Sequence, residues 1–361
     1  MTTSPFLNPV PRRSREFARR RRRRRRRALA AGMLIVILAA VAIVLLLSRS
    51  SGSHGPASAS NHPAPRSPSN ALAAPTRSAT GLPLDRPPLT LGLSAASDPI
   101  HLAFQHPPRG GLLFNLDTGR VLWQHDPLTR VRIASLTKMM TALLVERSQS
   151  PHAPVLITKQ AVASAGSKVG VLPLGRHVQL ETLLYGLMLP SGNDAAIALA
   201  QHTAGAITPF VTRMNQEAAK LGMGCTRYSS PSGYIDQGNY SCAADLAVLA
   251  HVDLGEPRLA RIVGSLKAVR PFPIKGGKLF LYNNNPLLRY GYPGVTGLKT
   301  GYTLAAGKCL VATAERDGIR VGVVLLDSRN PATQARQLLD RAFQGVYGQP
   351  RIVEPTIPAS E

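Results

Sequence analysis

Ser135 and Lys138 form the only Ser-x-x-Lys pair in the chain, and their residue types and spacing point to acyl-transfer chemistry. On a helix this spacing puts the hydroxyl and the amine on one face, one turn apart. A serine hydroxyl becomes a good nucleophile when a base removes its proton, and a lysine can be that base only as a free amine. Since the unperturbed pKa of lysine is about 10.4, the site must lower it by burial or with a second cation. A capping serine and a solvated lysine at a helix start would show the same spacing.

A second polar motif, Ser191-Gly192-Asn193, lies between two predicted helices. A loop in that position can aim polar side chains into a cleft. Ser191 can relay a proton to a leaving amine, and Asn193 can hydrogen-bond a substrate amide or hold Lys138. The alternative interpretation of Ser191 is an ordinary helix cap.

The third motif, Lys299-Thr300-Gly301, lies in a predicted strand rich in small residues, which leaves room for a ligand backbone along its edge. Lys299 and Thr300 could bind a carboxylate, and Lys299 could be the cation that keeps Lys138 neutral. The backbone N–H of Tyr302 could donate to an oxyanion, together with that of the serine nucleophile. Alone, this motif would be a glycine-rich edge strand, but the three motifs in this order indicate one serine acyl-transferase site.

Hydrophobic periodicity predicts the elements that must position these motifs. Residues 111–116 and 120–124 flank a turn and predict a β-hairpin. The predicted helices are 135–147, 178–188, 194–202 (with Asn193 or Asp194 as its cap), 208–221, 242–252 and 331–346, and the predicted late strands are 294–300, 309–314 and 320–327. Strands at both ends with helices between them predict an α+β domain whose terminal strands share one sheet.

The 361 residues are 44% apolar and carry a formal net charge of +24, which is concentrated near the N-terminus. Residues 1–27 are arginine-rich, and residues 28–47 contain no charged side chain. As a helix, about twenty such residues span roughly 30 Å, the thickness of a hydrocarbon core. By the positive-inside rule, residues 1–27 are predicted to be a cytoplasmic tail and residues 28–47 a single transmembrane helix in the cell membrane, with the remaining chain extracytoplasmic.

A cleaved signal peptide and a nucleic-acid-binding segment are the two alternatives for this N-terminal region. A cleaved signal peptide would have a shorter apolar region that ends at an Ala-x-Ala-like site, whereas this one ends in Leu47-Ser48-Arg49-Ser50. An arginine run can bind nucleic acid, but here it directly adjoins the apolar stretch. We therefore expect a membrane anchor and no nucleic-acid partner.

Composition also divides the rest of the chain. Residues 48–97 are dominated by Ser, Pro, Ala and Gly and predict a disordered tether, followed by a catalytic domain over 98–347 and a disordered tail over 348–361. Cys225 and Cys242 bracket one segment, so a disulfide between them and three buried thiols, including Cys309, both stay open. No Cys/His spacing is typical of a metal site, and we expect no metal and no cofactor.

Taken together, the motifs resemble the low-molecular-mass penicillin-binding proteins that act as D-alanyl-D-alanine carboxypeptidases. The resemblance rests on residues 134–141, 188–195 and 294–303 and covers roughly residues 108–345. It implies the β-lactamase/penicillin-binding-protein-like transpeptidase fold, in which an antiparallel sheet is flanked by helices and joined to a helical subdomain. Family members often carry His in the turn that here reads Pro231-Ser232-Gly233.

The resemblance also implies a role for each site residue. The substrate would be the D-Ala-D-Ala end of a peptidoglycan stem peptide, with water hydrolysing the acyl-enzyme, and β-lactams would acylate the same serine. In this interpretation Ser135 is the nucleophile, Lys138 is the general base and Ser191 is a proton relay. Asn193 orients the substrate, and Lys299 and Thr300 hold the substrate's carboxylate. Gly301 and Tyr302 complete the substrate-binding residues. Many relatives anchor through a C-terminal helix after a second domain, and we expect the N-terminal span to serve as the anchor here.

Three other functions are possible for a chain with a reactive serine or with this fold: a β-lactamase, a binding protein and a Ser-His-Asp hydrolase. A class A β-lactamase shares the motifs but needs a carboxylate for deacylation, and Glu217 and Glu256 do not stand in a suitable setting. A non-catalytic cell-wall binding protein on this fold would be expected to have lost the motifs, and all are present. A Ser-His-Asp hydrolase is disfavoured because the chain has no Gly-x-Ser-x-Gly elbow. No motif reports the acyl acceptor, the preferred stem peptide or the oligomeric state.

Overall fold

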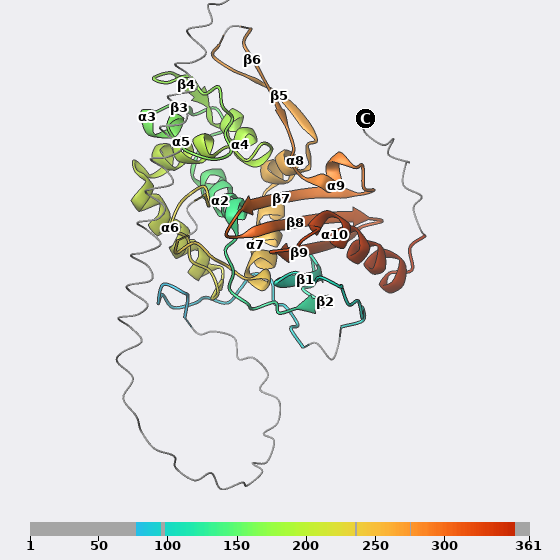
Figure 1. Ribbon diagram of the computed structural model, residues 1–361. Helices are drawn as coiled ribbons and strands as arrows, with labels where there is room; N and C mark the ends of the chain where they lie inside the picture. The colour runs from blue at the N-terminus through green and yellow to red at the C-terminus, as the bar shows by residue number, and fades with distance from the viewer. Residues whose placement is uncertain (1–76, 95–97, 235–236, 275, 351–361) are drawn as a thin grey trace, which may run out of the picture. The chain divides into compact units, whose positions relative to one another are not determined.

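A five-stranded antiparallel sheet runs through the computed structural model, which describes residues 77–94, 98–234, 237–274 and 276–350 (Figure 1). The strand order is β2-β1-β9-β8-β7, so strands from both ends of the domain share one sheet, as predicted. The strands are β1 (Gly110–Asn115), β2 (Val121–His125), β7 (Val295–Thr303), β8 (Gly307–Arg316) and β9 (Ile319–Leu326). Strand β7 lies at one edge of this sheet, so its outer side has no strand partner among the described residues.

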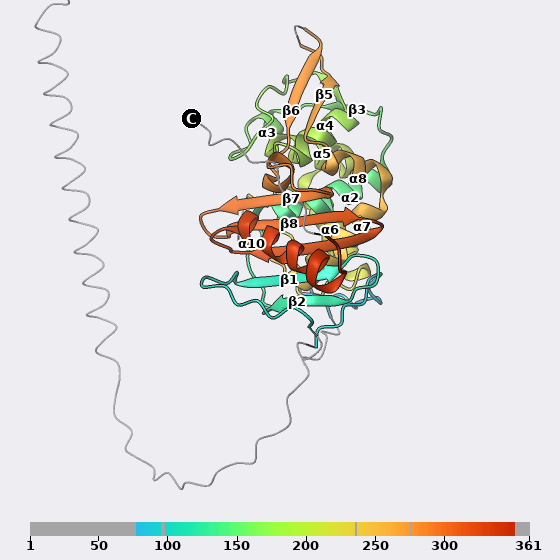
Figure 2. The same ribbon diagram turned by 90° about the vertical axis from the view of Figure 1, so that its right-hand side faces the viewer.

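Alternating residues of the inner strands supply two separate cores, one on each face of the sheet. On β9, Val323 and Leu325 join the cluster under α10 (Pro331–Asp340), whereas Val324 and Leu326 join the cluster on the opposite face. Figure 2 shows α10 crossing in front of the sheet, with α7 (Ala243–Gly255) behind it. A strand buried on both faces reads as a continuous apolar run, which explains why this segment was easy to predict.

The helices from α3 to α6, whose bounds follow, form a subdomain beside the sheet, at the left of Figure 1. The five internal helices predicted from periodicity are all present, as α2 (Lys138–Ser148), α4 (Leu180–Met188), α5 (Asn193–Ala204), α6 (Ile207–Lys220) and α7. The predicted final helix is divided into α10 and a π-helical turn, η3 (Arg341–Val346). The helix predicted over 135–147 begins as a 3-10 turn, η2 (Ala134–Thr137), before it continues as α2. The elements that periodicity missed are all short: β3 (Pro154–Leu156), α3 (Lys159–Val162), β4 (His177–Gln179), α8 (Pro257–Gly264), β5 (Lys267–Pro271), β6 (Lys278–Tyr282) and α9 (Pro286–Arg289).

Two local predictions are wrong. The N-cap of α5 is Gly192, not Asn193 or Asp194, because both of those side chains are used in tertiary hydrogen bonds. The expected tether also extends too far, because residues 77–94 pack on the domain: Leu89 is buried in the main core, and the N–H of Asp85 donates to Ala219 O at 3.2 Å.

Several predictions concern residues outside the described part of the chain. These are the cytoplasmic tail, the transmembrane helix, residues 48–76 of the tether and residues 351–361 of the tail. Within the described ranges, no helix combines the length and the hydropathy needed to cross a bilayer.

Asp253 on α7 is fully buried, and neither carboxylate oxygen has a hydrogen-bond partner among the described residues. Burial raises the pKa of this carboxyl well above its usual value, and nearby Arg147 only partly opposes that effect. A raised pKa in the folded state means that stability is complete below the pKa of the unfolded chain and falls as the pH rises toward the folded-state value.

We therefore expect Asp253→Asn to flatten the fall in Tm between acid and neutral pH, and to raise Tm by a few degrees at pH 8, because the amide cannot ionise. Differential scanning fluorimetry across this range measures the effect, and Asp85→Asn at an exposed position serves as the control. An unchanged pH slope in Asp253→Asn would contradict the assignment.

Candidate active site

Ser135 lies in η2, a single 3-10 turn that leads directly into α2. The preceding Ala134 has a φ of 46°, in the left-handed region that residues with a Cβ rarely adopt. Ser135 itself is partly exposed, whereas its neighbours in the turn are buried. The turn therefore presents a reachable hydroxyl on an otherwise closed surface.

Lys138 is the first residue of α2 and is completely buried. Its Nζ lies 2.9 Å from Ser135 Oγ, 2.7 Å from Asn193 Oδ1 and 2.6 Å from Ser232 O. Two of these three partners, the amide oxygen and the backbone carbonyl, can only accept hydrogen bonds. A neutral amine that donates its two protons to them directs its lone pair at the Ser135 hydroxyl, which is the arrangement that a general base needs.

The surroundings of Lys138 favour this neutral form. Burial lowers the pKa of the Lys138 amine well below its ordinary value, the charge of Lys299 lowers it further, and Asp194 acts in the opposite direction. The prediction that burial and a second cation act on this lysine agrees with the structure. The pair thus combines a buried amine with a hydroxyl that solvent can reach.

Ser191 and Asn193 lie where α4 ends and α5 begins. Asn193 Nδ2 donates to Ala165 O at 2.6 Å while its Oδ1 accepts from Lys138, so this amide links the amine to a neighbouring loop. Ser191 has a φ of 68° and is almost fully buried, and its Oγ has no hydrogen-bond partner among the described residues. A strained backbone that holds a hydroxyl without a protein partner is more typical of a functional site than of a helix cap.

Asp194 was predicted only as a helix cap, but it anchors the loop that faces Asn193. Its Oδ1 accepts from the N–H groups of Val169 and Ala195, both at 2.9 Å, and its Oδ2 accepts from that of Gly170 at 3.0 Å. The carboxylate is nearly inaccessible to solvent and already has three donors. It is therefore not available as a general base.

Lys299, Thr300 and Gly301 lie in the middle of the edge strand β7. A Cβ on Gly301 would lie 2.8 Å from Ile133 O and 3.2 Å from Ser135 N, so only glycine lets this strand approach the serine turn so closely. Three motifs that lie far apart in the sequence are thus brought to one place, as predicted.

The same strand contributes a second buried amine. Lys299 Nζ donates to Thr300 O at 2.9 Å, and burial lowers the pKa of Lys299 to about 7. A bound carboxylate would favour its charged form. The side chain of Tyr302 is 61% exposed, and the predicted part of this residue in the site is its backbone N–H.

Sequence reasoning missed the backbone partners of the site. Ser232 O accepts from Lys138, and the neighbouring Pro231 O accepts from Thr141 Oγ1 at 2.7 Å. Every residue has a carbonyl, so side-chain type gives no signal for such a partner. The one local hint is Gly233, with a φ of 72°, where a Cβ would lie 1.9 Å from Ala134 O. Because the backbone carbonyl makes the contact, the contact does not depend on which side chain stands at Ser232.

Comparisons with known proteins agree with this geometry. Residues 100–330 match the family described as D-alanyl-D-alanine carboxypeptidase. The chain is 33% identical over 246 residues to D-alanyl-D-alanine carboxypeptidase DacF of Bacillus subtilis, covering 66% of this chain and 62% of that protein. It is 35% identical over 222 residues to DacB2 of Mycobacterium tuberculosis, covering 61% of this chain and 75% of that one.

Among solved structures, a mutant of the Streptomyces K15 DD-transpeptidase matches with a TM-score of 0.62 at 32% identity, covering 67% of this chain and 99% of that one. The chain thus spans somewhat under two thirds of the length of DacF but nearly all of the K15 structure. The observed sheet and helical subdomain are those of the transpeptidase fold, which confirms the predicted fold class.

The coupling between the two buried lysines can be tested through the pH dependence of Ser135 acylation. The rate should rise with pH as Lys138 loses its proton, because only the free amine accepts the serine proton. Lys299→Met removes the neighbouring charge that lowers the pKa of Lys138, so we expect the midpoint to move to higher pH.

Intact-mass measurement of acylation by a neutral activated ester, between about pH 5 and pH 10, reports this midpoint without involving a substrate carboxylate. Lys308→Met, at an exposed lysine on β8, should keep the wild-type midpoint. The coupling is refuted if the acylation rate of Lys299→Met has the same pH midpoint as that of the wild type and of Lys308→Met.

Proposed function

The chain belongs to the D-alanyl-D-alanine carboxypeptidase family, and from that premise we propose that it removes the terminal D-alanine of peptidoglycan stem peptides through an acyl-enzyme on Ser135. The observation that carries the proposal is the set of contacts around Lys138. Its amine has two obligate acceptors, Asn193 Oδ1 and Ser232 O, and one remaining partner, the Ser135 hydroxyl.

In the acylation step, Lys138 takes the proton of Ser135 while Oγ attacks the carbonyl carbon of the penultimate D-alanine. The carbonyl oxygen becomes an oxyanion, which backbone N–H groups of Ser135 and Tyr302 would stabilise. Collapse of this intermediate breaks the peptide bond and leaves the acyl group on Ser135. The departing D-alanine nitrogen takes up a proton, for which the buried Ser191 hydroxyl is the proposed relay.

The edge strand β7 supports binding of an extended peptide with a free carboxylate. Its outer side is unpaired within the described sheet, so a peptide backbone can add to it as a further strand. Lys299 and Thr300 would bind the terminal carboxylate, and the charge of that carboxylate would hold Lys299 in its ammonium form. The proposed substrate therefore supplies the anion that this buried lysine lacks.

Deacylation needs a general base other than a protein carboxylate to activate the attacking water. Asp194 is fully engaged by backbone N–H groups, and Glu217 and Glu256 both pair with Arg147. These contacts argue against a class A β-lactamase, which depends on a glutamate for rapid deacylation. We propose that water is the usual acyl acceptor, activated by the same Lys138 amine, and that β-lactams leave a long-lived acyl group.

We further propose that the domain works outside the cell membrane, held by the predicted N-terminal span. The support is the arginine-flanked apolar stretch over residues 28–47, together with a substrate class that is found in the cell wall. Protease protection of the catalytic domain in intact cells and in inverted vesicles would test this placement.

Ser135→Ala should abolish labelling of the full-length chain by a fluorescent penicillin and lower D-alanine release from a D-Ala-D-Ala pentapeptide by about 10³-fold or more. Ser148→Ala, at a serine whose Oγ donates to Leu144 O outside the site, is the matched control and should keep both activities. Rapid penicillin turnover without D-alanine release would instead identify a β-lactamase, and absence of any label would favour a binding protein.

Ser191→Ala tests the proton relay separately. We expect kcat for D-alanine release to fall by about 10²-fold with little change in KM, since the relay acts on the leaving group and not on ground-state binding. Ser164→Ala is the comparison, because Ser164 Oγ also has no hydrogen-bond partner among the described residues. A kcat within twofold of the wild type in Ser191→Ala would rule the relay out.

A further inference from the structure

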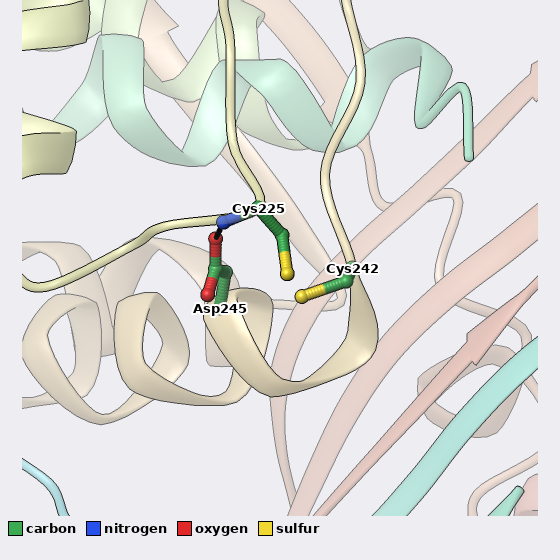
Figure 3. A group of neighbouring side chains, drawn as sticks. All are labelled: Cys225, Cys242 and Asp245. Carbon is green, nitrogen blue, oxygen red and sulfur yellow. Dashed lines mark hydrogen bonds between the residues drawn. The ribbon is translucent and has the colours of Figure 1, made fainter. Parts of the chain in front are cut away.

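Two cysteines that the proposed reaction does not use face each other in the segment between α6 and α7 (Figure 3). Cys225 lies in the loop after α6, and Cys242 immediately precedes the first residue of α7. Both are buried, and their sulfur atoms and a carboxylate oxygen of Asp245 lie within 4.8 Å of one another. The two sulfurs are not bonded in this structure.

Hydrogen bonds hold together the two segments that carry this pair. Arg227 and Tyr240 exchange two backbone hydrogen bonds, with N to O distances of 2.9 and 3.0 Å. Cys225 lies two residues before Arg227 and Cys242 two residues after Tyr240, and the N–H of Cys225 donates to Asp245 Oδ2 in the first turn of α7 at 2.8 Å. These bonds keep the two sulfur atoms close to each other.

We propose that Cys225 and Cys242 form a disulfide that closes the loop between α6 and α7 and so fixes the one backbone partner of the lysine proposed as general base. That loop contains Ser232, whose carbonyl accepts from Lys138, and Asn239, whose Nδ2 donates to Thr137 Oγ1 at 2.8 Å. Closing a loop covalently stabilises the fold chiefly by restricting the unfolded chain.

The chemistry is a thiol–disulfide exchange with an oxidant of the disulfide class, which the predicted extracytoplasmic location makes available. The thiolate of one cysteine attacks the oxidant disulfide and releases one thiol, forming a mixed disulfide. The second cysteine thiolate then attacks that mixed disulfide and releases the second thiol. The two cysteine protons end on the two released thiols, and the two electrons reduce the oxidant.

The burial of the pair determines when this exchange takes place. Burial raises the pKa of the Cys242 thiol, so the folded, reduced protein holds little thiolate and exchanges slowly. The bond therefore forms as the chain folds, and once formed it is shielded from reductants by the surrounding core.

The contacts of Asp245 favour a disulfide over a metal site at the same place. Its Oδ2 already accepts from the N–H of Cys225 at 2.8 Å and from Thr226 Oγ1 at 2.6 Å, and Figure 3 shows this carboxylate directed at the Cys225 backbone. The two protein donors occupy the lone pairs of Oδ2 and use this oxygen to position the loop, so Oδ2 could ligate an ion only by giving up one of those bonds.

The test maps thiols in the full-length chain prepared without reductant and denatured in iodoacetamide. We expect one alkylated cysteine, Cys309, before reduction and three after it. Trypsin cleavage after Lys220, Arg227 and Arg258 should give the fragments 221–227 and 228–258 as one cross-linked species. Three alkylated cysteines without reduction would overturn the proposal, and so would protection that chelator removes with release of about one zinc ion per chain.

A stability measurement gives a second readout. Wild-type protein that is unfolded and refolded in the presence of reductant should have a Tm about 5–10 °C lower than protein refolded without it, whereas the double variant Cys225→Ala, Cys242→Ala should be unaffected. Cys309→Ala is the matched control and should still respond to reductant like the wild type. Equal responses of the wild type and the double variant would contradict a stabilising bridge.

Discussion

The buried amine of Lys138 donates to Asn193 Oδ1 and to the Ser232 carbonyl, and these two hydrogen bonds tie together three separate parts of the chain. An amine without charge can be buried only when its donors are satisfied, so α2, the start of α5 and the loop before α7 must all reach the same point. The lone pair of the neutral amine then faces the Ser135 hydroxyl. The catalytic proposal and the packing of the helical subdomain thus depend on the same three contacts.

A second constraint is how closely backbones approach around the serine turn. At Gly301 on β7 and at Gly233 in the loop before α7, a Cβ would collide with the carbonyls of Ile133 and Ala134. The strand and the loop therefore both lie in close contact with the turn η2 that carries Ser135. Within this turn, Ala134 has a backbone conformation in the left-handed region. A hydroxyl held in this way keeps its position, which would reduce the cost of orienting the reacting atoms in the proposed acylation.

The division of labour between the sheet and the helices follows from burial. The inner strands are covered on both faces and provide rigidity, whereas the edge strand β7 keeps one side unpaired for a ligand. The proposed disulfide between Cys225 and Cys242 would add a covalent restraint to the loop that contains Ser232. Asp194 supplies a comparable restraint without a covalent bond, by holding the N–H groups of residues 169 and 170.

The sequence by itself determined the reactive side chains, the sheet and the main helices. Ser135, Lys138, Asn193 and Lys299 carry chemistry that residue type reveals, and long apolar runs such as β9 determine their own element through periodicity. Their roles in catalysis remain predictions for the variants to test. Whether the expected membrane span exists also remains a prediction, since it lies outside the described residues.

Only the tertiary structure decided which groups satisfy the buried amine and which cap begins α5. The Ser232 carbonyl was invisible in the sequence because every residue carries such an acceptor, and Asp194 was read as a cap because its distant backbone donors could not be seen. Residues 77–94 read as tether because their composition is that of a linker, yet Leu89 is buried in the core. Local patterns report side-chain chemistry and period, whereas hydrogen-bond partners far along the chain are chosen by packing.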